Sequence, residues 1–204
     1  MADPTDWRVQ RQSGMGAIAL SMAISLALWF ALVHFLPPLT AMESTGARMI
    51  VALKCVALAT LFCLVAGVEA VAHERLQSDA FDPLEGHETK RLRVNLRYLQ
   101  NTLEQTVIFA AGLFGLALYL DTGESMRAVV ASTVVWVLNR YAFWIGYHRS
   151  AAMRGLGAPS MALSLIMLLY VTARIGNDIA GTAGAAIAVA LYLAVEAVLF
   201  WKTR

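Results

Sequence analysis

The chain has 204 residues, of which 59% are hydrophobic and 15% are charged, and its mean hydropathy is +0.62. Soluble globular proteins average about 25% charged residues, so a soluble core of this size could not bury so much apolar surface and a bilayer must surround part of the chain. The formal net charge of +2, without a basic patch interleaved with aromatic residues, excludes nucleic acid as an expected partner.

Six apolar segments are predicted to be transmembrane helices, because open strands would leave backbone groups unpaired in lipid. They cover residues 14–36, 47–72, 93–120, 126–147, 159–172 and 179–201. The first ends at Pro37-Pro38, and it is too long for a signal-peptide core, so we expect it to be retained. The only long connection is the stretch from His73 to Lys90. The expected fold is therefore an all-α membrane protein with six spans.

The positions of the basic residues predict how the chain is oriented. With the N-terminus inside, eleven Lys and Arg residues fall in inner segments, whereas the outer loops hold only Arg48, Arg127 and Arg174. Cytoplasmic loops of membrane proteins carry an excess of Lys and Arg. We therefore expect a multi-pass protein with both termini in the cytoplasm.

Neither the cysteines nor the loop histidines predict a metal site or a disulfide. Cys55 and Cys63 lie in one apolar run, where small packing residues are expected. The polar residues of the long connection lack a metal-ligand spacing and are expected to be solvated; they are His73, Glu74, His87 and Glu88.

A polar stripe opens the third predicted helix. Arg97, Asn101 and Glu104 have the spacing i, i+4, i+7, which places them within about 60° of one another on a helix. A charge where this helix enters the membrane costs roughly 2.5–3.5 kcal/mol, so the stripe must face other helices or a ligand. The alternative is a ladder of salt bridges within the chain, with Arg97 paired to Glu104 or to its sequence neighbours.

A second polar group closes the fourth predicted helix. Arg140, Tyr147 and Arg154 are seven residues apart and share one face if the helix continues past Tyr147. Arg140 would lie about 10 Å deeper than Tyr147 and would need an anion or a carboxylate partner there. The alternatives are a pair with Glu104 or a side chain that extends to the lipid head groups.

Together the two groups suit a small zwitterionic or polyanionic ligand. Arginine binds carboxylates through two parallel hydrogen bonds, Glu104 can accept an ammonium group, and Asn101 can serve either partner. A cation beside a bound thiol lowers the pKa of that thiol and favours the reactive thiolate.

Two motifs carry a family resemblance. The pattern Arg97-x-x-x-Asn101-x-x-Glu104 resembles the signature of the MAPEG family, the membrane-associated proteins in eicosanoid and glutathione metabolism. The later run from Gly146 to Arg154 is similar to the ending of that family's third helix. The resemblance covers roughly residues 47–172. It implies a four-helix bundle that assembles as a homotrimer and binds glutathione between subunits at the cytoplasmic side.

The resemblance also implies roles for single residues. Arg97, Asn101 and Glu104 would hold the glutathione peptide, Tyr147 would assist, and Arg154 would stabilise the thiolate. Arg75 matches a basic position near the same pocket, and we add Arg140 to the predicted glutathione-binding residues. The implied organisation is an extra helix in residues 1–46, a MAPEG-like four-helix bundle in 47–175 and another extra helix in 176–204.

The leading functional hypothesis is a glutathione transferase or peroxidase that acts on a lipophilic electrophile from the bilayer. A non-catalytic scaffold that binds a lipid or organises a partner is the first alternative. A small transporter is the second, and only the membrane acids Glu69 and Glu196 support it.

Overall fold

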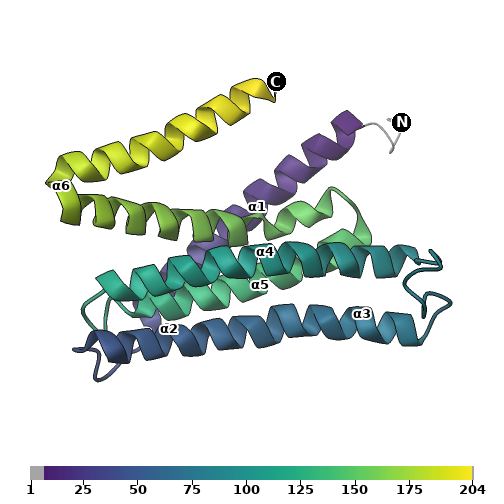
Figure 1. The fold of residues 1–204 in the computed structure, drawn as a ribbon, viewed down its shortest axis with the longest axis horizontal. Helices are drawn as coiled ribbons and strands as arrows, with labels where there is room; N and C mark the ends of the chain where they lie inside the picture. Colours follow the sequence, from purple (N-terminus) through teal and green to yellow (C-terminus); the bar gives the residue numbers. More distant parts are fainter. Residues whose placement is uncertain (1–6, 204) are drawn as a thin grey trace.

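The computed structural model describes residues 7–203, and the regular secondary structure of this part of the chain is helical, without strands (Figure 1). A π-helical turn, η1, joins α2 and α3 into one continuous helix, and a 3-10 turn, η2, precedes α6. The elements are α1 (Trp7–Phe35), α2 (Thr45–Ala59), η1 (Thr60–Val65), α3 (Ala66–Leu76), α4 (Lys90–Tyr119), α5 (Arg127–Arg149), η2 (Met153–Gly157) and α6 (Ala158–Lys202).

Within residues 7–203, five helical stretches are long and apolar enough to cross a membrane, which supports an integral membrane protein. The last of them contains both the fifth and the sixth predicted segments and is broken at Ala180 and Gly181. Gly181 has a φ of +62°, a left-handed conformation that favours glycine. At this break the chain reverses direction, and the second arm of α6 diverges from the first (Figure 1).

This break comes later than the sequence predicted. We expected the fifth helix to end near Thr172, yet the helix continues through Arg174 and Asp178. Both polar side chains find partners on the helix surface: Asp178 accepts a hydrogen bond of 2.8 Å from the Tyr119 hydroxyl, and the Arg174 guanidinium lies 4.9 Å from the centre of the Tyr119 ring. The helix therefore ends where glycine permits a reversal.

Small residues on one face of α2 and η1 allow the central helices to pack closely. Ala52, Cys55, Ala59 and Cys63 are buried against apolar side chains of α4 and α5. Both cysteines are free, buried thiols, which is consistent with the predicted role as packing residues.

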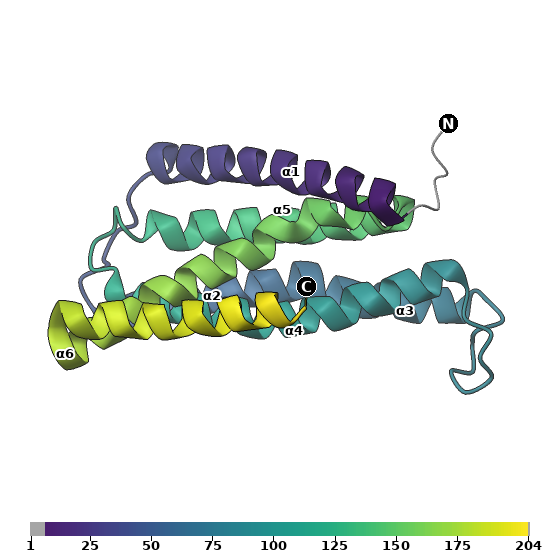
Figure 2. The ribbon, with the colours of Figure 1, turned by 90° about the horizontal axis from the view of Figure 1, so that it is seen from above.

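Helix α1 lies alongside α5 (Figure 2). Hydrogen bonds between side chains join these helices inside the bundle. The Ser25 hydroxyl lies 3.2 Å from the Asn139 amide oxygen, and the Trp29 indole N–H donates to the Ser132 hydroxyl at 3.0 Å. These polar contacts fix the position of α1 along α5, and therefore its position next to η2, the turn that follows α5.

Candidate functional site

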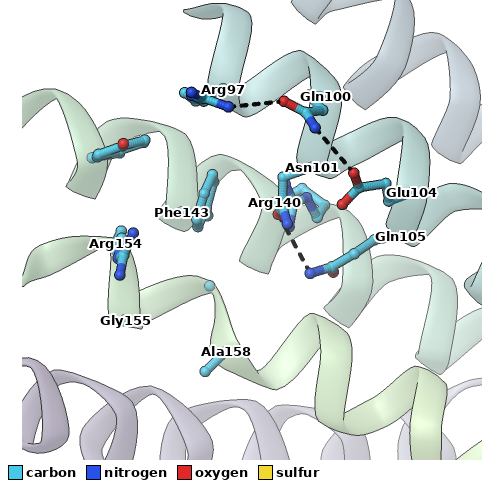
Figure 3. Close-up of a pocket in the computed structure, with 12 residues that line it drawn as sticks. Arg97, Gln100, Asn101, Glu104, Gln105, Arg140, Phe143, Arg154, Gly155 and Ala158 are labelled. Atoms are coloured by element: carbon cyan, nitrogen blue, oxygen red, sulfur yellow. Dashed lines mark hydrogen bonds between the residues drawn. The ribbon is translucent and has the colours of Figure 1, made fainter. Parts of the chain in front are cut away.

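A pocket of about 430 Å³ opens between α4, the end of α5 and the turn from η2 into α6 (Figure 3). Pockets of about 300–1,000 Å³ are typical of small-molecule sites. Three arginines and a single carboxylate line this pocket. Six of the seven predicted site residues contribute to it: Arg97, Asn101, Glu104, Arg140, Tyr147 and Arg154.

The start of α4 is held in place by its cap. The Thr89 hydroxyl accepts a hydrogen bond of 2.9 Å from the backbone N–H of Leu92 and donates one of 3.0 Å to Oε1 of Glu74 on α3. An N-cap of this kind satisfies one of the backbone donors that a helix leaves unpaired. The cap therefore fixes the turn of α4 that precedes the polar stripe.

The stripe on α4 is a hydrogen-bonded ladder rather than a salt bridge (Figure 3). Arg97 Nη1 donates to Gln100 Oε1 at 3.2 Å, and Gln100 Nε2 donates to Glu104 Oε1 at 3.3 Å. Within residues 7–203, no ion pair joins Arg97 to Glu104, so the predicted alternative of a direct pair is wrong. Gln100 bonds to both residues and so links them, and the side chains of Arg97 and Glu104 stay exposed to a ligand.

Arg140 lies at the inner wall of the pocket and is completely buried. Its Nη2 donates to the Thr102 hydroxyl at 2.8 Å, while Nε and Nη1 have no hydrogen-bond partner. The guanidinium carbon lies 4.7 Å from the centre of the Phe143 ring. Arg140 therefore neither pairs with Glu104 nor extends to the head groups, contrary to both alternatives. A buried cation with two unused donors favours an anionic ligand.

Arg154 reaches the pocket by a route that differs from the prediction. A shared face required the predicted helix of residues 126–147 to continue well past Tyr147, but α5 ends at Arg149 and the chain folds back into η2. Gly146 makes this return possible, because a Cβ there would overlap the carbonyl of Met153. The seven-residue spacing therefore does not reflect one helix face, although Tyr147 and Arg154 line the same pocket.

Comparisons with known proteins identify the family. A model of the MAPEG family matches residues 49–176, which is more than half of the chain. The chain belongs to the MAPEG family. The resemblance that the two motifs predicted is thus confirmed. An uncharacterized protein of Synechocystis sp., sll1147, is 35% identical over 74 residues, which cover 36% of this chain and 51% of that protein. No solved structure matches.

In this MAPEG protein the match runs from α2 to the first arm of α6. It leaves out α1 and the second arm. The finer division of the chain at residues 46/47 and 175/176 stays a prediction.

Arg75 is the predicted site residue that the single MAPEG chain does not bring to the pocket. It lies in the last turn of α3, and its Nη1 donates to the carbonyl of Ala80 at 3.2 Å. This contact holds the start of the α3–α4 connection.

Sequence reasoning missed several polar residues of this MAPEG protein. Gln100 and Gln105 both line the pocket, and Gln105 accepts a hydrogen bond of 2.9 Å from the Ser160 hydroxyl of α6. Asn95 is buried, and its side-chain oxygen accepts from the Trp144 indole N–H at 2.9 Å. The signal was present, because each is an amide in a segment that enters the membrane.

Proposed function

We propose that this MAPEG protein binds glutathione in the pocket and uses its thiolate on a lipophilic electrophile, as a transferase or a peroxidase. The observation that carries the proposal is Arg140, a buried guanidinium with two unpaired nitrogens in a pocket lined by three arginines and one carboxylate. Membership of the MAPEG family supports glutathione as the ligand, since the family is associated with glutathione metabolism.

The charges of the pocket match those of the peptide. Glutathione carries two carboxylates, one ammonium group and a thiol. Arg97 and Arg140 are suited to the carboxylates, because guanidinium groups form strong, directional hydrogen bonds with them. Among the described residues, Glu104 is the only acid that lines the pocket, and it is suited to the ammonium group. Asn101 can donate to a carboxylate or accept from an amide.

In this proposal Arg154 supports the chemical step, assisted by Tyr147. A guanidinium beside the sulfur stabilises the thiolate, which is the nucleophile. In the transferase reaction the thiol first loses its proton to water. The sulfur then donates an electron pair to an electrophilic carbon and forms the S–C bond, while the bond from that carbon to its leaving group breaks and the leaving group departs with the electron pair. Arg154 is exposed and has no hydrogen bond or ion pair to another residue of the range 7–203, so its charge is available to the sulfur.

We further propose that the protein is a homotrimer with six spans and both termini in the cytoplasm. The break at Gly181 supports six spans, because each arm of α6 has about 20 residues, the length that a bilayer requires. Exposure of Arg97 and Glu104 at the pocket mouth supports a site that a neighbouring subunit completes. Arg75 would then act on a neighbour's pocket.

Thermal unfolding with and without millimolar glutathione tests binding, with the protein purified in an uncharged detergent. Glutathione at about one hundred times its dissociation constant would stabilise the protein by about 2.7 kcal/mol. We expect Arg97→Ala to reduce the shift. Arg93→Ala is the matched control, because Arg93 is an exposed arginine one turn earlier on α4 and does not line the pocket. An unchanged midpoint in the wild type would contradict glutathione binding.

A second measurement separates catalysis from binding. Arg154→Ala should keep most of the glutathione shift but lose conjugation of a chromogenic electrophile. Equal turnover by the variant would remove Arg154 from its role. A wild-type protein that binds glutathione without conjugating or reducing any electrophile would instead support the non-catalytic scaffold.

A further inference from the structure

A second groove, of about 360 Å³, lies between α1 and the η2 turn. Arg154 and Gly155 line both this groove and the pocket, so the two cavities share a wall. Figure 3 shows η2, with Arg154 and Gly155 labelled, between α4 and the passing helix α1. The α1 side of the groove comes from outside the part of the chain that matches the MAPEG family.

Close packing fixes α1 against this turn. A Cβ on Gly155 would lie 2.9 Å from the carbonyl oxygen of Gly14 and 3.0 Å from Cγ1 of Ile18, so the two backbones approach as closely as glycine allows. Arg11 is three residues before Gly14, almost one helical turn, and lines the groove from α1. The packing therefore places guanidinium groups from two separate elements around one groove.

The groove has a cationic end and an apolar end. Arg11 and Arg154 are both exposed, and neither forms a hydrogen bond or an ion pair with another residue of the range 7–203. No carboxylate among the described residues lines the groove. Met15 and Ile18 follow on α1 and are 59% and 39% exposed. Ile18 lies about 10 Å along the helix from Arg11, towards the middle of the membrane.

We propose that this groove binds an anionic amphiphile. Its phosphate or carboxylate group would lie between Arg11 and Arg154, and its acyl chain would run along Met15 and Ile18. Guanidinium groups suit such head groups, and the exposed apolar side chains suit the chain. The assignment of this ligand as the lipophilic reactant rests on the proposed function, because a head group at Arg154 would then lie next to the glutathione thiolate. Binding itself does not depend on glutathione.

The test measures the affinity for dodecyl phosphate without glutathione, using the intact protein in dodecyl maltoside and isothermal titration calorimetry. We expect Arg11→Gln to bind about tenfold more weakly than the wild type, the size of effect of a charged hydrogen bond, and Arg11→Lys to lose less. Arg149→Gln is the matched control, because Arg149 is an exposed arginine that ends α5 and does not line the groove. Inorganic phosphate alone should bind far more weakly, since it lacks the acyl chain.

Three outcomes decide the proposal. Equal affinity of the wild type and a monodisperse Arg11→Gln would overturn it, whatever glutathione does to the thermal midpoint. A loss of affinity in Arg97→Gln but not in Arg11→Gln would also overturn it, because the amphiphile would then occupy the pocket. If Arg11→Gln weakens binding, a competition experiment identifies the source of the ligand. Competition by phosphatidylglycerol, but not by phosphatidylcholine, would show that the groove takes a lipid of the bilayer. If phosphatidylglycerol does not compete, the ligand is a single-chain amphiphile.

Discussion

Two buried arginines, Arg48 and Arg140, meet their hydrogen-bonding needs in opposite ways. Arg48, 7% exposed, lies in the first turns of α2 and donates to the carbonyls of Met42, Glu43 and Ala117 and to the Thr45 hydroxyl. Arg140, 0% exposed, makes one such bond. Neither has a carboxylate partner among residues 7–203.

This difference separates a structural cation from one that suits a ligand. A buried charge is costly unless hydrogen bonds compensate for the water that it loses. The protein's own backbone supplies that compensation at Arg48, so the arginine joins the α1–α2 connection to the end of α4. At Arg140 the arrangement is incomplete, and the oxygens of an anion in the pocket would complete it.

The largest expected effect is the loss of stability in Arg48→Met. The substitution leaves three carbonyl oxygens without their donor, one of them in the bundle interior, and should cost about 2–3 kcal/mol of unfolding free energy. Thermal unfolding in detergent measures it. Lys54→Met, an exposed position on the same helix, is the control and should behave like the wild type. A midpoint of Arg48→Met equal to that of the control would mean that Arg48 is not structural.

Arg140→Met should give the reverse result. An apolar side chain in place of a buried cation without a counter-ion should leave the unliganded thermal midpoint unchanged or raise it. Glutathione affinity should fall about tenfold to a hundredfold, because a charged hydrogen bond contributes about 1.5–3 kcal/mol. Titration calorimetry measures the affinity. If the unliganded midpoint falls as far as in Arg48→Met, the two arginines share a structural role and the comparison fails.

The sequence predicted which residues line the pocket better than it predicted the surroundings of Arg48 and Arg140. Helical spacing alone placed Arg97, Asn101 and Glu104 on one face, because α4 is a regular helix there. It could not predict the return of the chain after Arg149, which depends on a backbone contact between Gly146 and Met153 that is not periodic.

The burial of Arg48 could not be predicted from the sequence either. Arg48 was counted with the outer loops and is instead a buried residue of α2, because three backbone carbonyls, two from the α1–α2 connection and one from α4, accept hydrogen bonds from it. Convergence of that kind depends on how helices and connections meet in space. No spacing rule within one segment reports it.

Thr102→Val tests whether the single hydrogen bond of Arg140 holds its guanidinium group in the pocket. The Thr102 hydroxyl is the one hydrogen-bond acceptor that the described residues offer Arg140, so its loss should let the guanidinium turn away from the pocket. We expect glutathione affinity to fall about fivefold, since one hydrogen bond contributes about 1 kcal/mol. Thr106→Val is the matched control: its hydroxyl donates to the Thr102 carbonyl at 2.7 Å. Equal affinities in the two variants would show that Thr102 does not orient Arg140.

The smallest effect is expected from the equivalent change at the other arginine, Thr45→Val. Arg48 would lose one acceptor of four and keep its three carbonyls, so the guanidinium should stay in place. The unfolding free energy should fall by about 0.5 kcal/mol, the lower end for a single hydrogen bond, and glutathione affinity should not change. Thermal unfolding and titration of the same preparation test both. A loss as large as that of Arg48→Met would mean that the hydroxyl, rather than the carbonyls, holds Arg48, and the two arginines would then each depend on a single threonine.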